Sequence, residues 1–73
     1  MNQAVKYYQL AADQGYARAQ FNLGNCYNYG LEVTKDVHQA VKYYQFAADQ
    51  GHANAQYNLG ICYKNGHGVT KDI

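Results

Sequence analysis

The side chains most able to do chemistry in this sequence are its three histidines and its five acidic residues. No two of the histidines are three or four residues apart, which is the spacing that brings two zinc ligands onto one face of a helix. We therefore predict solvated or helix-capping roles for His38, His52 and His67. We expect no metal site from this pattern.

The aspartates occur as two pairs whose members are separated by the same interval, Asp13 with Asp49 and Asp36 with Asp72. Recurrence at that interval indicates helix ends rather than a pair of catalytic carboxylates. The sequence also lacks a nucleophile and base at catalytic spacing, a phosphate-binding loop and a cofactor fingerprint. We therefore expect a protein that is not an enzyme and needs no cofactor.

The two cysteines, Cys26 and Cys62, are separated by that interval as well. If they occupy equivalent helices of a stack, those helices lie about 10 Å or more apart. A disulfide requires Cα atoms within about 7 Å of each other. We therefore predict two free, mostly buried thiols, and their state does not identify a cellular compartment.

Charge and hydropathy exclude two classes of partner. The net charge is +1 and no basic run is present, so nucleic acid is not an expected partner. The chain has no stretch of about 20 apolar residues, so no membrane span is expected. The tyrosine pairs at 7–8 and 43–44 could stack on bases, but such platforms need a basic groove. We assign these tyrosines to a core between helices.

The elements that position these residues come from an internal repeat. Residues 3–15 recur as residues 39–51, and 25 of the 34 positions from 3 to 36 are identical to the residue 36 positions later. A period of this length is typical of a helix–turn–helix unit that stacks on its neighbours. The expected helices are residues 2–14, 17–29, 37–50 and 53–64.

Residues at the helix boundaries agree with this assignment. Asp36 and Gln39 have the spacing of a capping box. Glycines follow the expected helix ends, where a left-handed residue terminates a helix; they are Gly15, Gly30, Gly51 and Gly66.

The apolar residues have helical spacing, and small residues among them allow close packing. The two predicted stripes are Ala40, Tyr44, Ala47 and Ala48, and Ala19, Leu23, Cys26 and Tyr27. Glycine inside a helix costs about 1 kcal/mol relative to alanine. We therefore predict that Gly24 and Gly60 each lie at a tight helix crossing.

Together these residues resemble the Sel-one-like repeat family, a relative of the tetratricopeptide repeat. The resemblance rests on Ala19, Leu23, Gly24, Tyr27 and Gly30, followed by Val33, Asp36, Ala40, Tyr43, Tyr44, Ala47, Ala48 and Gly51. It covers nearly the whole chain. It implies an all-α fold, a right-handed α/α superhelical solenoid of antiparallel helix pairs, and a non-enzymatic adaptor in protein complexes.

Two positions depart from the pattern of that family. Gly66 and Gly68 keep its usual Gly-x-Gly-Val loop, but Glu32 replaces the second glycine in the earlier copy, so that loop is expected to bend differently. Tyr43 stands where the family often has tryptophan. The expected organisation is a single array, with a partial repeat at 1–15, a complete repeat at 16–51 and part of a further repeat at 52–73.

Five of the nine differences between the copies fall on one face of the first helix of the repeat, apart from the residues assigned to packing. In tetratricopeptide-like stacks this face lines the concave groove. We predict that the groove binds a peptide or a partner protein through side chains on this face, although a merely solvated face would show the same variation. The predicted contact residues are Arg18, Phe21, Asn22, Asn25, Tyr29, Asn54, Tyr57, Asn58, Ile61 and Lys64.

Solenoids need polar terminal caps, and neither end of this sequence resembles one. We therefore expect either that the chain is part of a longer array or that it associates end to end with copies of itself. Three functions are compatible with the sequence: an interaction scaffold, a structural unit that contacts only its own copies, and a regulatory module of a longer protein.

Overall fold

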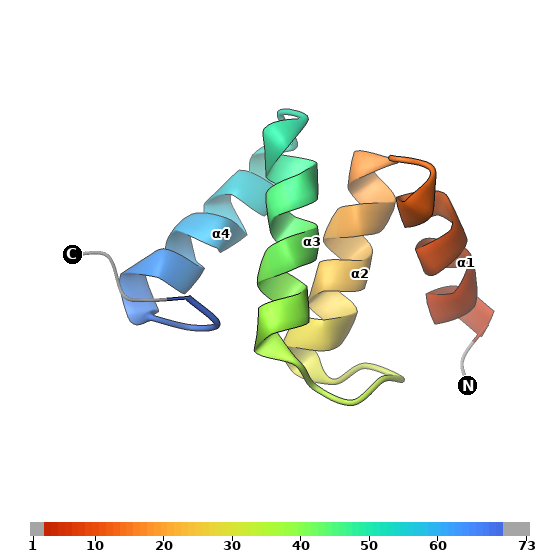
Figure 1. Ribbon diagram of the computed structural model, residues 1–73, viewed down its shortest axis with the longest axis horizontal. Coiled ribbons are helices and arrows are strands. Elements are labelled where there is room, and N and C mark those ends of the chain that lie inside the picture. Colours follow the sequence, from red (N-terminus) through yellow and green to blue (C-terminus); the bar gives the residue numbers. More distant parts are fainter. Residues whose placement is uncertain (1–2, 70–73) are drawn as a thin grey trace.

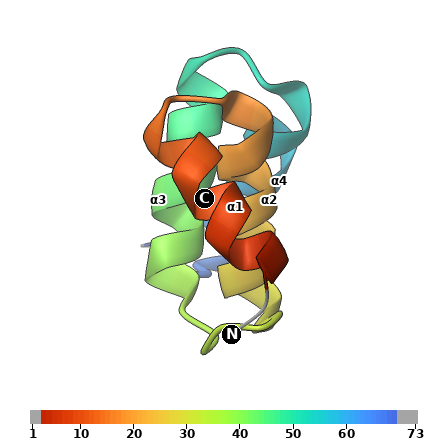
Figure 2. The ribbon, with the colours of Figure 1, turned by 90° about the vertical axis from the view of Figure 1, so that its right-hand side faces the viewer.

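The computed structural model describes residues 3–69, which form four α-helices in a row. They are α1 (Gln3–Asp13), α2 (Ala17–Tyr29), α3 (Val37–Asp49) and α4 (Ala53–Asn65) (Figure 1). These bounds confirm the expected helices to within one residue at each described end. Each helix packs on the next one along the chain, and Figure 2 shows α1 in front of the others, with α3 to the left of α2 and α4. The fold is an all-α repeat solenoid.

Local signals set the helix ends. The Asp36 carboxylate accepts hydrogen bonds from the backbone N–H groups of His38 and Gln39 at the start of α3, which are groups that the helix itself cannot satisfy. The reciprocal half of a capping box is absent here, because the N–H of Asp36 donates to the carbonyl of Tyr27 at 2.9 Å. That bond joins the end of α2 to the start of α3.

Left-handed glycines end the helices as predicted. Gly30 and Gly66 have φ angles of 67° and 66°, and Gly15 and Gly51 have φ angles of 92° and 86°. Glu32, with φ of 61°, is the one described residue other than glycine in this region. Its counterpart Gly68 has φ of 79°. The expectation that the two loops bend differently is wrong at this position, because Glu32 adopts the same left-handed conformation.

The core follows the two predicted stripes. One buried cluster joins α1 and α2 through Val5, Ala12, Ala19, Leu23 and Cys26. The other joins α3 and α4 through Ala40, Tyr44, Leu59 and Cys62, and Phe21 and Tyr27 of α2 pack against it. The Cα atoms span 38 × 25 × 14 Å. In such a thin layer, a helix with a neighbour on each side is far better buried than a helix at the end of the row.

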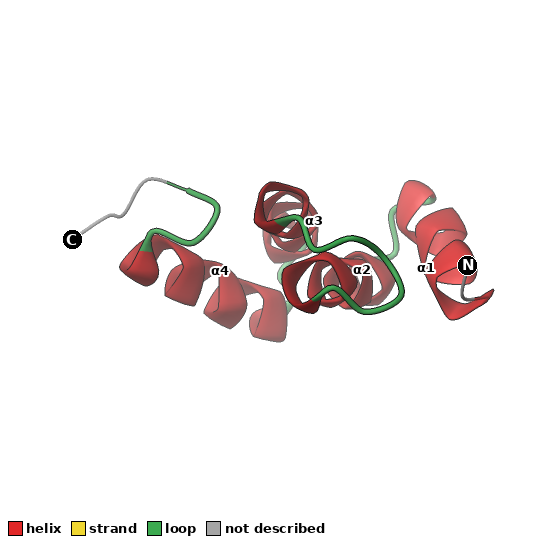
Figure 3. Cartoon of the chain, turned by 90° about the horizontal axis from the view of Figure 1, so that it is seen from below, coloured by secondary structure: helices red, strands yellow, loops and turns green. Residues whose placement is uncertain are grey.

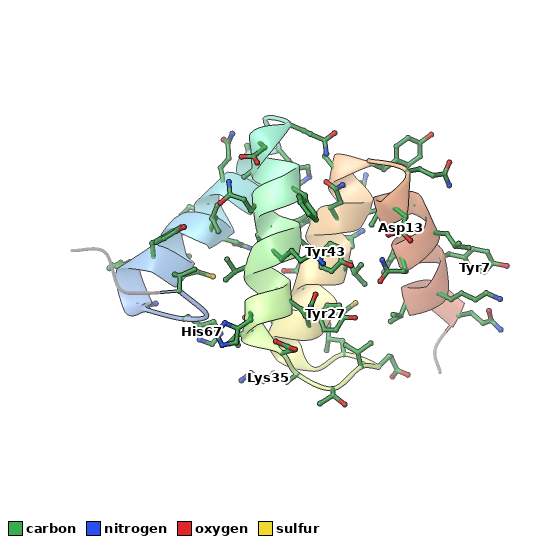
Figure 4. All side chains as sticks on the ribbon, viewed as in Figure 1. Tyr7, Asp13, Tyr27, Lys35, Tyr43 and His67 are labelled. Atoms are coloured by element: carbon green, nitrogen blue, oxygen red, sulfur yellow. The ribbon has the colours of Figure 1, made fainter. Side chains whose placement is uncertain are left out.

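The aromatic pairs show this end effect. Tyr43 stacks on Tyr27 of the preceding helix, with ring centroids 6.0 Å apart (Figure 4), and Tyr44 is fully buried. Tyr7, which corresponds to Tyr43, is 62% exposed and points away from the molecule (Figure 4). The assignment of Tyr7 to the core is therefore wrong within this chain, because α1 is the first helix that the structure describes.

The two mid-helix glycines differ for the same reason. A Cβ added at Gly24 would lie 2.8 Å from two ring carbons of Tyr44, which confirms the predicted tight crossing. A Cβ added at Gly60 would meet nothing within 4 Å. The prediction of a tight crossing at Gly60 is therefore wrong in this chain, because no described helix packs on that side of α4.

Both cysteines are free and buried, as predicted. Desolvation by burial raises the pKa of each thiol above its usual range. His52 has the predicted capping role, since its Nδ1 accepts from the N–H of Ala55 at 3.2 Å at the start of α4. No helix in the described part of the chain is long and apolar enough to cross a membrane. No three metal-ligating side chains gather among residues 3–69.

Candidate interaction groove

The candidate site is a groove between α2 and α4, which lie on one side of the molecule with α3 on the other (Figure 3). A cavity of about 250 Å³ lies here. Its lining comes from α2, α3, α4 and the loop after α4, and comprises Asn28, Tyr29, Tyr44, Asn58, Ile61, Cys62, Asn65 and His67. The groove is therefore lined by aromatic rings and neutral amides.

Tyr44 supplies the aromatic ring from α3. Its hydroxyl donates to Oδ1 of Asn25 at 2.5 Å. Burial is the main cause that raises the pKa of Tyr44 to about 12, and the neighbouring Tyr29 phenol adds to it, while hydrogen bonds to Asn58 and Asn28 act in the opposite direction. The Tyr44 phenol thus stays protonated at physiological pH, and its hydrogen bond to Asn25 ties the ring to α2.

The loop after α4 closes one end of the cavity. His67 Nε2 lies 2.9 Å from Oδ1 of Asn28, so one contact links this loop to α2. Figure 4 shows His67 on the loop, directed toward the lower part of α3. Because Gly66 is left-handed, the chain turns back sharply enough to make this contact.

Three of the ten predicted contact residues line this cavity, namely Tyr29, Asn58 and Ile61. Tyr29 and Tyr57 are 65% and 70% exposed, and Ile61 is 39% exposed. Arg18, Asn54 and Lys64 are also exposed, and Asn22 and Asn58 are half-buried. Asn22 lies in a second, more apolar cavity beside Tyr8 and Tyr16 rather than in the cavity that contains Asn58.

Phe21 and Asn25 contact side chains of the chain itself, although they were expected on the face turned away from the packing residues. The Phe21 ring packs on Tyr44 and His52, with centroid distances of 5.9 and 4.9 Å, and Asn25 is bonded to Tyr44. The expected separation of the variable face from the packing face is therefore wrong at these two positions. Helix geometry could have shown this, because residues 21, 24 and 25 share a face.

Five lining residues were missed as contact residues: Asn28, Asn65, Cys62, His67 and Tyr44. Asn28 and Asn65 each belong to a pair that differs between the copies, and this difference was the available signal. His67 belongs to a loop, and its position depends on the left-handed turn at Gly66. Tyr44 comes from the opposite layer and reaches the groove only because Gly24 has no side chain.

The charge of the groove helices has one sign. Arg18 and Lys64 are the charged residues of α2 and α4, and neither helix contains an aspartate or a glutamate. The acidic residues at 13, 32, 36 and 49 lie on other elements. Neither charged residue lines the 250 Å³ cavity itself, and Arg18 lies beside the second cavity together with Asn22.

The sequence resembles two curated mammalian proteins over part of its length. The proteins named DAP3-binding cell death enhancer 1 of Rattus norvegicus and of Mus musculus are each 44% identical over 34 residues. That segment is 47% of this chain and 7% of each relative. The chain therefore corresponds to a small part of either relative.

Solved structures agree over almost the whole chain. The crystal structure of a Sel1 repeat protein from Oxalobacter formigenes has a TM-score of 0.91 and 43% sequence identity, covering 93% of this chain and 28% of its own. A protective antigen present in uropathogenic Escherichia coli strains, described as having an SLR fold, also has a TM-score of 0.91. It is 42% identical and covers 97% of this chain and 15% of its own.

The family comparison covers the full sequence. Residues 1–16, 17–52 and 53–73 each match the Sel1 repeat. Sel1 repeat proteins are in general protein-interaction modules and form a scaffold family without catalysis. The 36-residue period, the helix pairs and the left-handed glycines agree with this match, and the chain belongs to the Sel1 repeat family.

Proposed function

We propose that the groove between α2 and α4 binds an extended peptide segment of a partner protein and that the chain acts as a non-enzymatic scaffold. One observation carries the proposal: aromatic side chains and amides from three helices and a loop surround a single cavity of about 250 Å³. Amides can bond both the N–H and the C=O groups of a peptide backbone. Exposed aromatic rings supply apolar contact area, and such residues are enriched where proteins bind each other.

The charge distribution narrows the expected partner. With Arg18 and Lys64 on the groove helices and no acidic residue there, a peptide with acidic side chains beside an apolar one fits best. Rim charges of this kind steer association and select partners more than they add affinity. A partner with several lysines or arginines is therefore disfavoured.

The test uses a random peptide library displayed on phage and selected against the whole chain. Selected peptides are expected to combine acidic and aromatic residues. Tyr29→Ala and Asn65→Ala remove exposed groove side chains, and each is expected to weaken the selected peptide at least about tenfold, as truncation of a binding hot spot does. Leu31→Ala is the matched control, because Leu31 is 50% exposed on the loop just beyond Tyr29.

Three results would overturn the proposal. One is the absence of any peptide that is enriched above background. Another is a selected peptide that binds Tyr29→Ala and Asn65→Ala as tightly as it binds the wild type. Equal losses in these variants and in Leu31→Ala would likewise place the binding site elsewhere.

A further inference from the structure

Helices α1 and α3 have almost the same sequence but different surroundings. Residues 3–13 and 39–49 differ only in Leu10 and Phe46. Helix α3 packs against both α2 and α4, whereas α1 packs against α2 and reaches α3 through a hydrogen bond from Gln9 Nε2 to the Tyr43 hydroxyl. The sequence that fits against α2 in α3 is thus present a second time, in a helix with no described neighbour on its other side.

The contacts between α2 and α3 show which features of a neighbouring helix accommodate the sequence shared by α1 and α3. Tyr44 requires the bare backbone of Gly24 under its ring. Phe21 fills the space beside Tyr44 and His52. The side chain of Gln50, just after α3, donates from Nε2 to Oε1 of Gln20 at 2.7 Å.

Helix α4 presents equivalent groups, and they are uncovered. Gly60 corresponds to Gly24, and a Cβ placed on it would meet nothing within 4 Å. Tyr57 corresponds to Phe21 and is 70% exposed. Gln56 corresponds to Gln20, and its Nε2 already donates to the carbonyl of Ala48, as Gln20 donates to that of Ala12.

The α1 side of the molecule has the complementary space. Tyr8 and Tyr16 correspond to Tyr44 and His52, the two residues that hold Phe21. No residue among 3–69 takes the place of Phe21 here, and an apolar cavity of about 460 Å³ occurs instead. Tyr8, Tyr16, Ala17, Arg18, Ala19 and Asn22 line it. Tyr57 is thus exposed on α4, and the pocket beside Tyr8 and Tyr16 is open on the α1 side. Inside the chain the corresponding groups are in contact, because Phe21 packs on Tyr44 and His52.

We propose that a second copy of this chain stacks head to tail on the first, with α1 of one copy on α4 of the other. Tyr8 then covers Gly60, Tyr57 enters the pocket beside Tyr8 and Tyr16, and Gln14 donates to Gln56. The arrangement repeats the α2–α3 contact, so it continues the solenoid. Because the two surfaces differ, the contact is heterologous and leaves a free surface at each end for further copies.

One difference weakens the contact between copies relative to the internal one. Asn25 accepts a hydrogen bond from the Tyr44 hydroxyl, but the residue corresponding to Asn25 on α4 is Ile61. Tyr8 therefore loses this amide partner at the junction, and a buried hydroxyl without its partner reduces the affinity. Association is expected to be reversible and to depend on concentration, and Ile61→Asn is expected to strengthen it.

The experiment measures the weight-average mass of the whole 73-residue chain by sedimentation equilibrium over a wide concentration range. The wild type is expected to grow beyond a dimer as concentration rises. Gly60→Ala and Gly60→Leu place a side chain where the Tyr8 ring would lie, and both are expected to stay monomeric. These variants still fold, because the side chain points into open space in the single copy and the helix gains intrinsic propensity.

A mixing experiment tests the head-to-tail geometry. Tyr16→Arg introduces a charge at the α1 pocket, at a residue that is 67% exposed in the single copy. Gly60→Leu blocks the opposite surface. Each variant alone is expected to be monomeric, whereas a mixture is expected to give a closed one-to-one dimer, since each supplies the surface that the other lacks.

Several outcomes would overturn the proposal: a wild type that is monomeric throughout, a dimer that never grows, Gly60 variants that associate like the wild type, or a mixture that stays monomeric. Asn65→Ala is the control that separates this contact from the peptide groove. It is expected to associate normally while losing the peptide, and Gly60→Leu is expected to do the reverse.

Discussion

The ring of Tyr44 lies against the backbone of Gly24, so closely that a Cβ at Gly24 would be 2.8 Å from Cδ1 and Cε1 of the ring. This one contact determines how near α2 and α3 approach. It also brings the Tyr44 hydroxyl to the groove, where it donates to Asn25. Scaffold and candidate binding site therefore share a residue, and changes at Gly24 affect both.

Alanine is expected to have opposite effects at the two equivalent glycines. At Gly24 it overpacks the contact with Tyr44, and the gain in helix propensity of about 1 kcal/mol offsets part of a cost of about 1–3 kcal/mol, so the free energy of unfolding falls by as much as about 2 kcal/mol. At Gly60 only the propensity gain of about 1 kcal/mol remains. Urea unfolding of both variants at a concentration where the chain is monomeric measures the two changes. The same sign at both positions would contradict this reading.

Glu32 carries a backbone strain that glycine would remove. Its φ of 61° is unfavourable for a residue with a side chain, by about 1–2 kcal/mol. Glu32→Gly is expected to stabilise the chain by about 0.5–1 kcal/mol, because the greater freedom of glycine in the unfolded chain cancels part of the gain. Thermal unfolding measures the change.

Gly68, at the equivalent position, provides the reference for that experiment. A Cβ on Gly68 would lie 2.6 Å from the carbonyl oxygen of Val37, so Gly68→Ala is expected to destabilise the chain through both the clash and the positive φ. If Glu32→Gly had no effect on the melting temperature, the left-handed conformation at residue 32 would carry no measurable strain.

The helices could be predicted well from the sequence because each residue that marks a helix end or a buried face occurs again 36 positions later. Asp36, the left-handed glycines and the spacing around Leu23 and Tyr44 are local features, and local features determine where a helix begins, ends and buries a face. The free, buried state of Cys26 and Cys62 followed from repeat geometry alone. None of these conclusions depends on what lies beyond the chain.

Predictions failed where the neighbour of a residue mattered. Gly60 and Tyr7 have the same types as Gly24 and Tyr43, yet they are open because the helix that would cover each is absent from residues 3–69. Phe21 and Asn25 were assigned to binding because they vary between copies. Both also make contacts inside the chain, since Phe21 packs on His52 and Asn25 accepts a hydrogen bond from Tyr44. Their part in binding a partner stays a prediction.

Stability is expected to fall at high pH because of Tyr44. Burial raises its pKa to about 12 from the ordinary value of 10.0, so the folded chain retains a proton that the unfolded chain releases first. The contribution is fully present below pH 10.0 and is lost as pH rises toward about 12, and it amounts to about 2 kcal/mol after solvent screening. Urea unfolding across this pH range measures the loss.

Tyr44→Phe serves as the control for this experiment. The variant loses the hydrogen bond to Asn25 and is expected to be less stable at neutral pH by about 1 kcal/mol. Its stability is expected to depend less on pH, and the difference between the two curves isolates Tyr44. Parallel curves would show that the Tyr44 phenol titrates alike in the folded and unfolded chains.

The two thiols are expected to react at different rates although both are buried. Cys26 and Cys62 are 6% and 4% exposed, and burial raises the pKa of each, which lowers the fraction of reactive thiolate. Both are therefore expected to react with an aromatic disulfide reagent much more slowly in the folded chain than in urea.

Cys62 also lines the groove cavity, whereas Cys26 does not. The expected order is Cys62 before Cys26, measured in Cys26→Ala and Cys62→Ala, each of which retains a single thiol. A bound groove peptide is expected to slow Cys62 and leave Cys26 unchanged, because only the first lies beneath it. If Cys26 reacted first, or if the peptide slowed both thiols equally, reagent access would depend on general unfolding, and the groove would have no part in it.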